Sequence, residues 1–369
     1  GGDGDDEIDG GSGTNRIYGD AGDDTIISSG TNDVVDAGAG NNNITISSTA
    51  NSGQYTSGDG NDIYKIQEGA SGNVTITSGD GIDEFVVNSS NLININIYAN
   101  GNGVKTLNLN QGHLRRFDSG SGDDVITSSS GTTIGAYYDQ GINTRAGNDT
   151  ITLDGSLMDR ASVNLGEGND NLSINGGSQS DNSYSHSPYY SYIYGEAGDD
   201  TITVSGDNAT RIRVYLGEGN DTFNASAATN LDAERSSVRG GIGDDTLVGN
   251  DNNNLFYGDA GNDTLVSGSG DDSLYGGGNN DTLNAGGGND VIYGGNNSAK
   301  GDDGSVDIAV FSGTSNDYKV SRATDVNFGY VYYIQDTRDD SPDGLDTLYD
   351  IDRLKFSDGE FAIETYYQE

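Results

Sequence analysis

The sequence predicts an all-β protein: a right-handed parallel β-roll or β-helix solenoid with a small C-terminal β-rich capping domain. Three observations support this fold class. The 369 residues include 59 glycines, nonapeptide repeats run in phase near both ends, and one apolar residue recurs in each repeat. Such a chain can bury a continuous core only by stacking each repeat on the next.

The clearest repeats are nine residues long. From Gly240 the chain divides into GGIGDDTLV, GNDNNNLFY, GDAGNDTLV, SGSGDDSLY, GGGNNDTLN and AGGGNDVIY, and residues 1–45 divide into five similar units. Glycines at positions 1, 2 and 4 permit a tight turn with positive φ, and position 8 faces inward on a short strand. The residues expected to face inward are Ile8, Ile17, Ile26, Val35, Ile44, Leu247, Phe256, Leu265, Leu274, Leu283 and Ile292.

Composition indicates that a cation takes part in folding. The chain has 17 Lys and Arg against 59 Asp and Glu, a formal net charge of −42, and self-repulsion on that scale opposes compaction. One buried apolar side chain per repeat, at roughly 2 kcal/mol, cannot offset about 1–2 kcal/mol of backbone entropy for every ordered residue. Cysteine is absent and only two histidines occur. The available ligands are therefore oxygens, which suit multiple Ca²⁺ ions.

Position 6 of each repeat supplies the expected calcium ligand. Two nonapeptides make one turn, so residues 18 apart stack at the strand spacing of about 4.8 Å. In the middle region the same turn recurs about every 21 residues, on one edge only, with Asn42 and Lys105 at two of the positions in the column. A second column, on the opposite edge, is expected only at the two ends of the solenoid. The predicted metal ligands are Asp6, Asp24, Asp33, Asp62, Asp83, Asp124, Asp149, Asp170, Asp200, Asp221, Asp245, Asp263, Asp272, Asp281 and Asp290.

The nonapeptides follow the pattern G-G-x-G-x-D-x-U-x, with U apolar, and in this the chain resembles the RTX family of haemolysin-type calcium-binding repeat proteins. The resemblance implies folding on Ca²⁺ outside the cell after type I secretion. The stretch from DYKVSR to DTR, followed by DGLDTLYDIDRLKFSDG, is similar to the C-terminal module of type I secreted RTX proteins, which include metalloproteases and mannuronan epimerases. In that family the module carries uncleaved secretion information. The ending TYYQE lacks the acidic-then-apolar last four residues of the protease branch, and capping of the solenoid alone is the alternative.

These patterns divide the chain into four regions. Residues 1–45 form a regular nonapeptide β-roll, 46–239 an irregular β-solenoid with longer turns and loop insertions, 240–295 a second regular β-roll, and 296–369 the C-terminal cap and secretion module. No apolar run reaches the roughly 18 residues of a transmembrane segment. The chain begins in mid-repeat without a methionine, and we expect it to be a piece of a longer protein.

Several side chains allow two interpretations. Lys105 either replaces a cation among carboxylates or belongs to a polysaccharide-modifying site with His113, Arg115 and Arg116. The first is favoured, because neither an Asp-Pro-His-Glu epimerase motif nor an HExxH zinc motif occurs. A stabilising ladder of Tyr257, Tyr275 and Tyr293, which are 18 residues apart, is favoured over a ligand surface. A tyrosine-rich insertion either packs on the flank of the solenoid or offers a platform for sugar rings; it contains Tyr184, His186, Tyr189, Tyr190, Tyr192 and Tyr194.

The sequence thus predicts an extracellular or cell-surface, calcium-binding structural module from a surface-layer, adhesin or matrix protein of a Gram-negative-type bacterium. Candidate partners are extracellular polysaccharide and neighbouring surface proteins. Nucleic acid and anionic membranes would be repelled by the acidic chain. No catalytic or organic cofactor-binding residue is expected. The alternative is the C-terminal folding and targeting portion of a secreted enzyme, such as a polysaccharide epimerase, a lyase or a protease.

Overall fold

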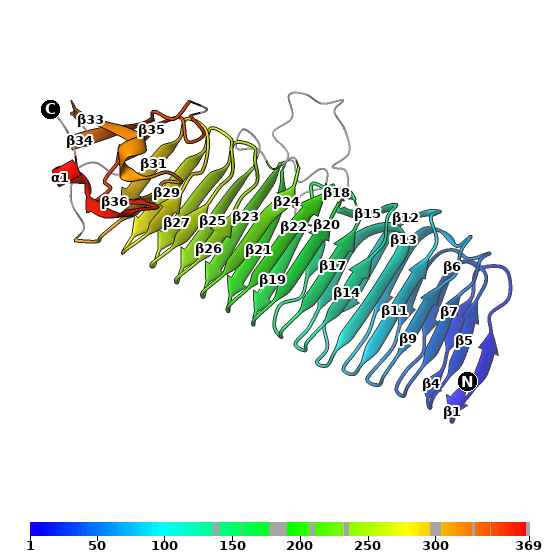
Figure 1. Ribbon diagram of the computed structural model, residues 1–369. Coiled ribbons are helices and arrows are strands. Elements are labelled where there is room, and N and C mark those ends of the chain that lie inside the picture. The colour runs from blue at the N-terminus through cyan, green and yellow to red at the C-terminus, as the bar shows by residue number, and fades with distance from the viewer. Residues whose placement is uncertain are drawn as a thin grey trace. The chain divides into compact units, whose positions relative to one another are not determined.

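A computed structural model describes residues 1–135, 140–155, 157–176, 190–206, 211–229, 231, 236–295, 304–326, 329–339 and 341–366. In this part of the chain nearly all regular structure is β-strand, apart from the 3₁₀ turn η1 (Ser315–Asp317) and the short helix α1 (Ile363–Tyr366). The chain divides into two compact units, Gly1–Tyr194 and Gly195–Glu369. The predicted all-β solenoid is confirmed, because each unit stacks parallel strands turn upon turn (Figure 1).

In unit 1, each turn contributes strands to two parallel ladders. The first ladder contains β2 (Glu7–Asp9), β5 (Thr25–Ser28), β7 (Asn43–Ile46), β9 (Ile63–Ile66), β11 (Asp83–Asn88), β13 (Lys105–Ser119), β14 (Val125–Ser128), β17 (Thr150–Asp154) and β20 (Asn171–Asn175). The second contains β3 (Arg16–Tyr18), β6 (Thr31–Asp36), β8 (Asn51–Thr56), β10 (Ser71–Thr77), β12 (Leu92–Ala99), the later part of β13, β15 (Thr132–Gly135), β16 (Gly141–Asn143), β18 (Leu157–Asp159) and β19 (Ser162–Glu167). A short pair, β1 (Gly2–Asp3) and β4 (Asp20–Ala21), lies apart from both.

Unit 2 repeats this arrangement. Its first ladder contains β22 (Thr201–Gly206), β24 (Thr222–Ala228), β26 (Thr246–Val248), β28 (Thr264–Val266), β30 (Thr282–Asn284), β32 (Ile308–Val310) and β36 (Arg353–Phe356). Its second contains β23 (Ile212–Glu218), β25 (Ser237–Ile242), β27 (Leu255–Ala260), β29 (Ser273–Gly278), β31 (Val291–Gly295) and β35 (Leu345–Tyr349). Strand β21 (Ser191–Ala197) includes the boundary between the units.

The core lies between the two ladders, where Phe223 of the first ladder meets Phe256 of the second edge to face, with their centroids 6.2 Å apart. Leu247 pairs with Leu265 and Leu265 with Leu283 in adjacent turns, and all three are fully buried. Of the position-8 residues expected to face inward, all are buried except Ile8, which is half-buried in the first strand of its ladder. In unit 1 larger rings also fill the core, where Tyr64 stacks on Phe85 with their centroids 5.3 Å apart.

The tyrosine ladder is confirmed and is longer than predicted. Tyr257, Tyr275 and Tyr293 stack with centroid separations of 4.8 and 4.7 Å, and Tyr349 continues the stack at 4.4 Å. Arg239 covers the other end, with its guanidinium carbon 4.1 Å from the Tyr257 centroid. Because the ring faces are occupied by one another, the ladder stabilises the sheet rather than offering faces to a ligand.

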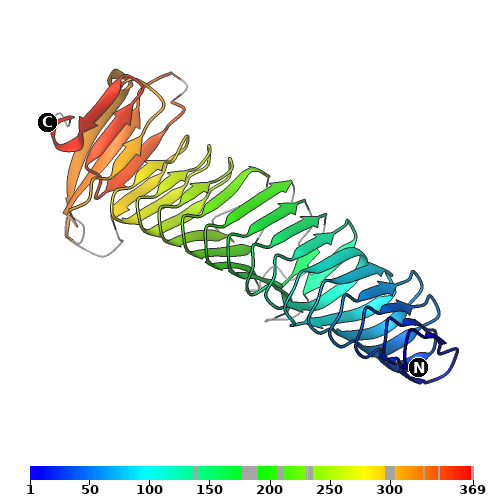
Figure 2. The ribbon, with the colours of Figure 1, turned by 90° about the horizontal axis from the view of Figure 1, so that it is seen from below.

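The C-terminal module is built differently from the repeats (Figure 2). The antiparallel hairpin of β33 (Tyr318–Asp325) and β34 (Gly329–Asp336) pairs onward with β35, and β36 pairs antiparallel with β37 (Gly359–Ala362). Strands β35 and β36 also pair in parallel with β31 and β32. The module therefore covers the open strand edges at the end of both ladders, as a cap does.

Candidate metal centre

The position-6 side chains stack in a column within each unit. Where an aspartate or asparagine follows in the next turn, its Oδ1 atom accepts a hydrogen bond from the backbone N–H of the equivalent residue one turn earlier. In unit 1, with N to Oδ1 distances of 2.6 to 3.1 Å, the residues joined in this way are Asp6, Asp24, Asn42, Asp62 and Asp83, and then Lys105, Asp124, Asp149 and Asp170. In unit 2, at 2.8 to 2.9 Å, they are Asp200, Asp221, Asp245, Asp263, Asp281 and Asp307.

A second column lies on the opposite edge, near the two ends of the chain. There Asn15 donates to Asp33 at 2.8 Å, whereas near the other end Asn254 donates to Asp272 and Asp272 to Asp290, at 2.6 and 2.8 Å. This placement agrees with the two-edged ends that the sequence predicts. Each aspartate in these columns has a second carboxylate oxygen, which takes no part in these hydrogen bonds.

That second oxygen, Oδ2, is buried and lacks a hydrogen-bond partner at many of the column positions. Native proteins pair nearly all of their buried polar atoms, so a regular series of unpaired oxygens indicates a group that the protein atoms alone do not supply. A cation is the partner that a carboxylate oxygen in such a place requires. The positions are Asp24, Asp62, Asp124, Asp149, Asp221, Asp245, Asp263, Asp272 and Asp290.

The pKa values of these carboxyl groups point the same way. Burial is the largest cause of each rise, because it disfavours the charged form, and neighbouring carboxylates add to it. The pKa of Asp62 and that of Asp170 are raised by the same burial. The pKa rises to about 7 at Asp149, Asp245 and Asp290, and to about 6 at Asp124, Asp221, Asp263 and Asp272.

The glycine at position 1 leaves space beside the unpaired oxygen. A Cβ added at Gly258 would lie 2.2 Å from Asp263 Oδ2 and 2.4 Å from the carbonyl oxygen of Gly276 in the next turn. The same cradle exists at Gly240, where a Cβ would lie 2.2 Å from Asp245 Oδ2. Glycine is therefore required here because a side chain would collide with the oxygens, not because of a positive φ.

Lys105 shows which atoms surround the cation position. Its fully buried Nζ donates to the carbonyl oxygens of Gly79 and Gly81 at 3.0 and 2.9 Å, and to Asp83 Oδ2 at 2.8 Å. The carbonyl oxygen of Asn102 lies 3.5 Å away. These contacts agree with the interpretation that the Lys105 ammonium takes the place of a cation among carboxylates. By the same register, a cation would be held by the carbonyls four and two residues before each aspartate, its Oδ2, and a carbonyl of the next turn.

Asparagine at position 6 fills the same position with its own amide. Asn42 Nδ2 donates to the carbonyls of Gly38 and Gly40, at 3.3 and 3.1 Å, which are the carbonyls four and two residues earlier. Asn254 Nδ2 likewise donates to the carbonyls of Asn250, at 2.9 Å, and of Asn252. An amide N–H therefore occupies two of the expected cation ligands at each of these turns.

Three predicted ligands differ from the rest. Asp33 Oδ2 accepts hydrogen bonds from Ser28 Oγ at 2.7 Å and from the backbone N–H of Gly30 at 3.0 Å, so it lacks the unpaired oxygen. Asp83 Oδ2 is taken by Lys105. Asp6, in the first turn, is only half-buried.

Three aspartates of the C-terminal module continue the columns and were missed from the sequence. Asp281 donates its N–H to Asp307 Oδ1, and Asp307 donates to Asp352 Oδ2, each at 2.9 Å. On the other edge Asp290 donates to Asp346 Oδ1, also at 2.9 Å. The segment SPDGLDTLY, residues 341–349, carried a usable signal, because Gly344, Asp346 and Leu348 occupy positions 4, 6 and 8 of a nonapeptide.

The basic residues near Lys105 do not join it. His113 contacts the carbonyl of Gly135, Arg115 Nε donates to Gln140, and Arg116 pairs with Asp118 and lies over Tyr98. Arg116 and Asp118 line a cavity of about 160 Å³ on the second ladder. Lys105 does not line that cavity, and its ammonium contacts Asp83 and backbone carbonyls rather than the other three side chains, so the four do not form one catalytic cluster.

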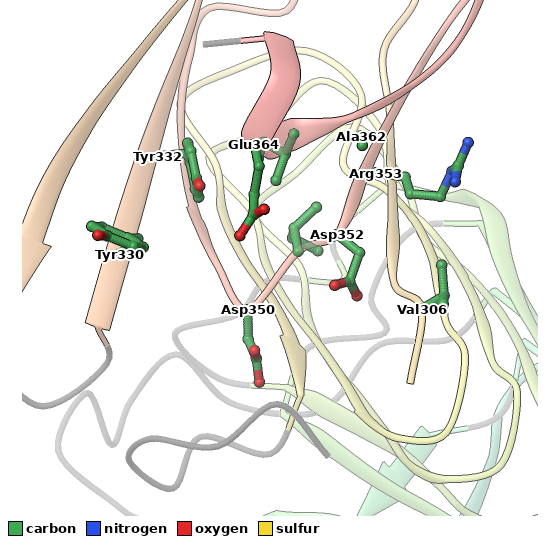
Figure 3. A pocket seen from close by; sticks show the side chains of 10 residues that line it. Val306, Tyr330, Tyr332, Asp350, Asp352, Arg353, Ala362 and Glu364 are labelled. Atoms are coloured by element: carbon green, nitrogen blue, oxygen red, sulfur yellow. The ribbon is translucent and has the colours of Figure 1, made fainter. Parts of the chain in front are cut away.

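A larger cavity of about 440 Å³ lies in the C-terminal module (Figure 3). Tyr330, Tyr332, Asp350, Asp352 and Glu364 surround it. Asp352 already accepts the N–H of Asp307. Among the described residues no group of three or more His, Cys, Asp and Glu side chains is arranged to hold a metal. The proposed cation position in each repeat does not require such a group of side chains, since backbone carbonyls supply most of its oxygens.

Part of the tyrosine-rich insertion can be placed. Tyr184, His186 and Tyr189 lie outside the described residues. Tyr192 and Tyr194 of β21 stack with centroids 6.1 Å apart. This contact is that of a packed aromatic pair, and the role of the insertion as a sugar platform stays a prediction.

Comparison with known proteins identifies the repeats. The family model described as the RTX calcium-binding nonapeptide repeat (4 copies) matches residues 1–35, 9–44, 190–210, 239–274 and 266–298. A search of curated proteins found no match. The matched segments contain the turns with the buried, unpaired carboxylate oxygens described above, at Asp24, Asp245, Asp263, Asp272 and Asp290. In these segments the chain matches the RTX calcium-binding nonapeptide repeat.

Proposed function

We propose that the chain is an extracellular structural module that folds when several Ca²⁺ ions fill its turns. The observation that carries the proposal is the column of buried carboxylates whose Oδ2 atoms lack partners. Ca²⁺ accepts six to eight oxygen ligands in flexible geometry, including backbone carbonyls and carboxylates. The carbonyl set around Lys105 Nζ, transferred to the aspartate turns, provides such ligands.

Calcium binding and folding are one process in this proposal. The unfolded chain cannot assemble carbonyls and carboxylates from consecutive turns, so the free energy of binding contributes to folding. Bound Ca²⁺ would also offset part of the formal charge of −42 and remove the penalty for burying ionised carboxylates. The thin apolar core then suffices.

This coupling suits a chain that is exported unfolded by type I secretion and folds outside the cell. We place it at the cell surface or in the extracellular matrix of a Gram-negative-type bacterium, in a surface-layer, adhesin or matrix protein. The C-terminal module would carry the secretion information and cap the solenoid. Among the described residues, no helix is long and apolar enough to cross a membrane.

The proposal predicts the calcium concentration at which the chain folds. Sites that work outside cells have dissociation constants of roughly 10⁻⁴ to 10⁻³ M, and we expect folding to begin in that range. The measurement is a titration of free Ca²⁺ in chelator buffers, followed by far-UV circular dichroism, with Mg²⁺ as the control ion. Complete folding at submicromolar Ca²⁺, or equal folding with Mg²⁺, would count against an extracellular calcium switch.

A further inference from the structure

We propose that residues 341–349 are a further repeat turn inside the C-terminal module, and that a Ca²⁺ ion held between this turn and the last regular repeat fastens the module to the solenoid. The inference rests on the proposed function, since it uses the same chemistry. It adds a turn outside the segments that match the repeat family, the last of which ends at residue 298.

The backbone of this turn continues the register of the repeats. Ile292 pairs with Leu348 in the same parallel ladder in which Leu274 pairs with Ile292. Thr347 N–H donates to the carbonyl of Asp290 at 2.8 Å, just as Val291 N–H donates to that of Asp272 at 2.9 Å. The turn is therefore stacked on its neighbour as one regular repeat is stacked on another.

The side chains at positions 5 and 6 repeat the same pattern. Asp290 N–H donates to Asp346 Oδ1 at 2.9 Å, as Asp272 N–H donates to Asp290 Oδ1 at 2.8 Å. Leu345 N–H donates to Asn289 Oδ1 at 3.1 Å, as Asn289 N–H donates to Asp271 Oδ1 at 2.8 Å. The match at both positions indicates a genuine turn of the solenoid.

The carboxylates at this junction need a cation. Asp290 is 1% exposed and its Oδ2 lacks a hydrogen-bond partner, and Asp346 is 2% exposed. Two buried carboxyl groups in neighbouring turns repel each other when both are ionised.

The remaining oxygens follow from the contacts of Lys105. Its ammonium contacts the carbonyls four and two residues before Asp83, and a carbonyl three residues before its own position. Transferred to the junction, these are the carbonyls of Gly286, Gly288 and Asp343. The backbones are close enough, since a Cβ added at Gly344 would lie 1.8 Å from the Gly288 oxygen.

An ion pair network positions the loop that supplies these atoms. Arg338 Nη2 lies 2.8 Å from Asp336 Oδ2, 3.2 Å from Asp343 Oδ1 and 2.9 Å from the hydroxyl of Tyr318. The Asp343 carboxylate is thus occupied within the module and only its carbonyl remains for the ion. The network connects the proposed site to strands β33 and β34.

The test compares Asp346→Asn and Asp346→Lys by calorimetric calcium stoichiometry and by limited proteolysis of the C-terminal module. Asparagine keeps an acceptor for the N–H of Asp290 but removes the charge. Lysine at position 346 copies Lys105. Lys105 lies one turn after Asp83 in the first column, and residue 346 lies one turn after Asp290 in the second. The control is Asp339→Asn, which removes an exposed charge from the same loop.

Both Asp346 variants are expected to bind about one Ca²⁺ fewer than the wild type, and Asp339→Asn the same number. Asp346→Asn should be cleaved in the module at calcium concentrations where the wild type resists, whereas Asp346→Lys should resist, because its ammonium replaces the ion. Unchanged stoichiometry in Asp346→Asn, or equal protease sensitivity of the two Asp346 variants, would overturn the inference. The proposed function would fail separately, through absence of calcium binding by the wild type.

Discussion

Replacing Lys105 by aspartate is expected to create one more calcium site. The substitution restores the repeat pattern in the one column position of unit 1 that carries a cation of its own. It frees Asp83 Oδ2 and the carbonyls of Gly79 and Gly81, which now bind the ammonium. Calorimetry should show about one additional Ca²⁺ per chain. An unchanged stoichiometry would contradict the account of Lys105.

The matched control is Lys105→Met, which removes the ammonium without supplying a carboxylate at position 105. It leaves Asp83 buried beside unpaired carbonyls, and breaking a buried ion pair in this way typically costs about 3–5 kcal/mol. In saturating Ca²⁺, denaturant unfolding should show a loss of that order for Lys105→Met and a much smaller loss for Lys105→Asp. Equal losses would mean that Lys105 acts only through its packing.

Lowering the pH from 7.5 to 5 is expected to stabilise the calcium-free chain. The pKa values of the column aspartates are raised in the folded state, to about 6 or 7 at Asp149, Asp245 and Asp263, from about 3.9 in the unfolded chain. A group with a raised pKa contributes stability that is fully present below its unfolded pKa and is lost as the pH rises through its folded pKa. The gain should therefore appear between about pH 7 and pH 4.

Far-UV circular dichroism in chelator at several pH values measures this effect as a gain of β-structure in acid, with the calcium-saturated chain as the control. There the ion has already replaced the proton, and acid should weaken binding rather than strengthen the fold, because ligands must be deprotonated to bind metal. A β-strand content of the calcium-free chain that increases from pH 5 to pH 7.5 would have the wrong sign for this account.

The sequence predicts most of the solenoid because equivalent positions in successive repeats have the same burial and the same kinds of neighbour. The period of nine places Leu265 and Leu283 in the core and Tyr257 beside Tyr275, and the structure agrees. The role of Lys105 could also be predicted, because aligning its turn with the others puts its side chain at position 6, where the other turns have an aspartate or asparagine. In such a fold each repeat contacts only the repeats next to it, so the repeat pattern in the sequence also specifies the tertiary contacts.

What the sequence did not predict depends on contacts outside that period. Asp346 follows Asp290 by 56 residues, because the hairpin of β33 and β34 intervenes, so counting by nine or eighteen does not reach it. Asp33 looked like the other ligands, but Ser28 and Gly30 satisfy its second oxygen. The Asn42 amide donates to the carbonyls of Gly38 and Gly40, a contact that exists only in the folded turn and that the repeat pattern does not indicate.

The central claim is that calcium and folding cannot be separated in this chain. Far-UV circular dichroism of the purified protein at pH 7.5, first in chelator and then in millimolar Ca²⁺, tests it most directly. The account predicts a largely disordered spectrum in chelator and a β-rich spectrum after calcium is added, reversible on chelation. A β-rich spectrum in chelator, unchanged by calcium, would contradict it.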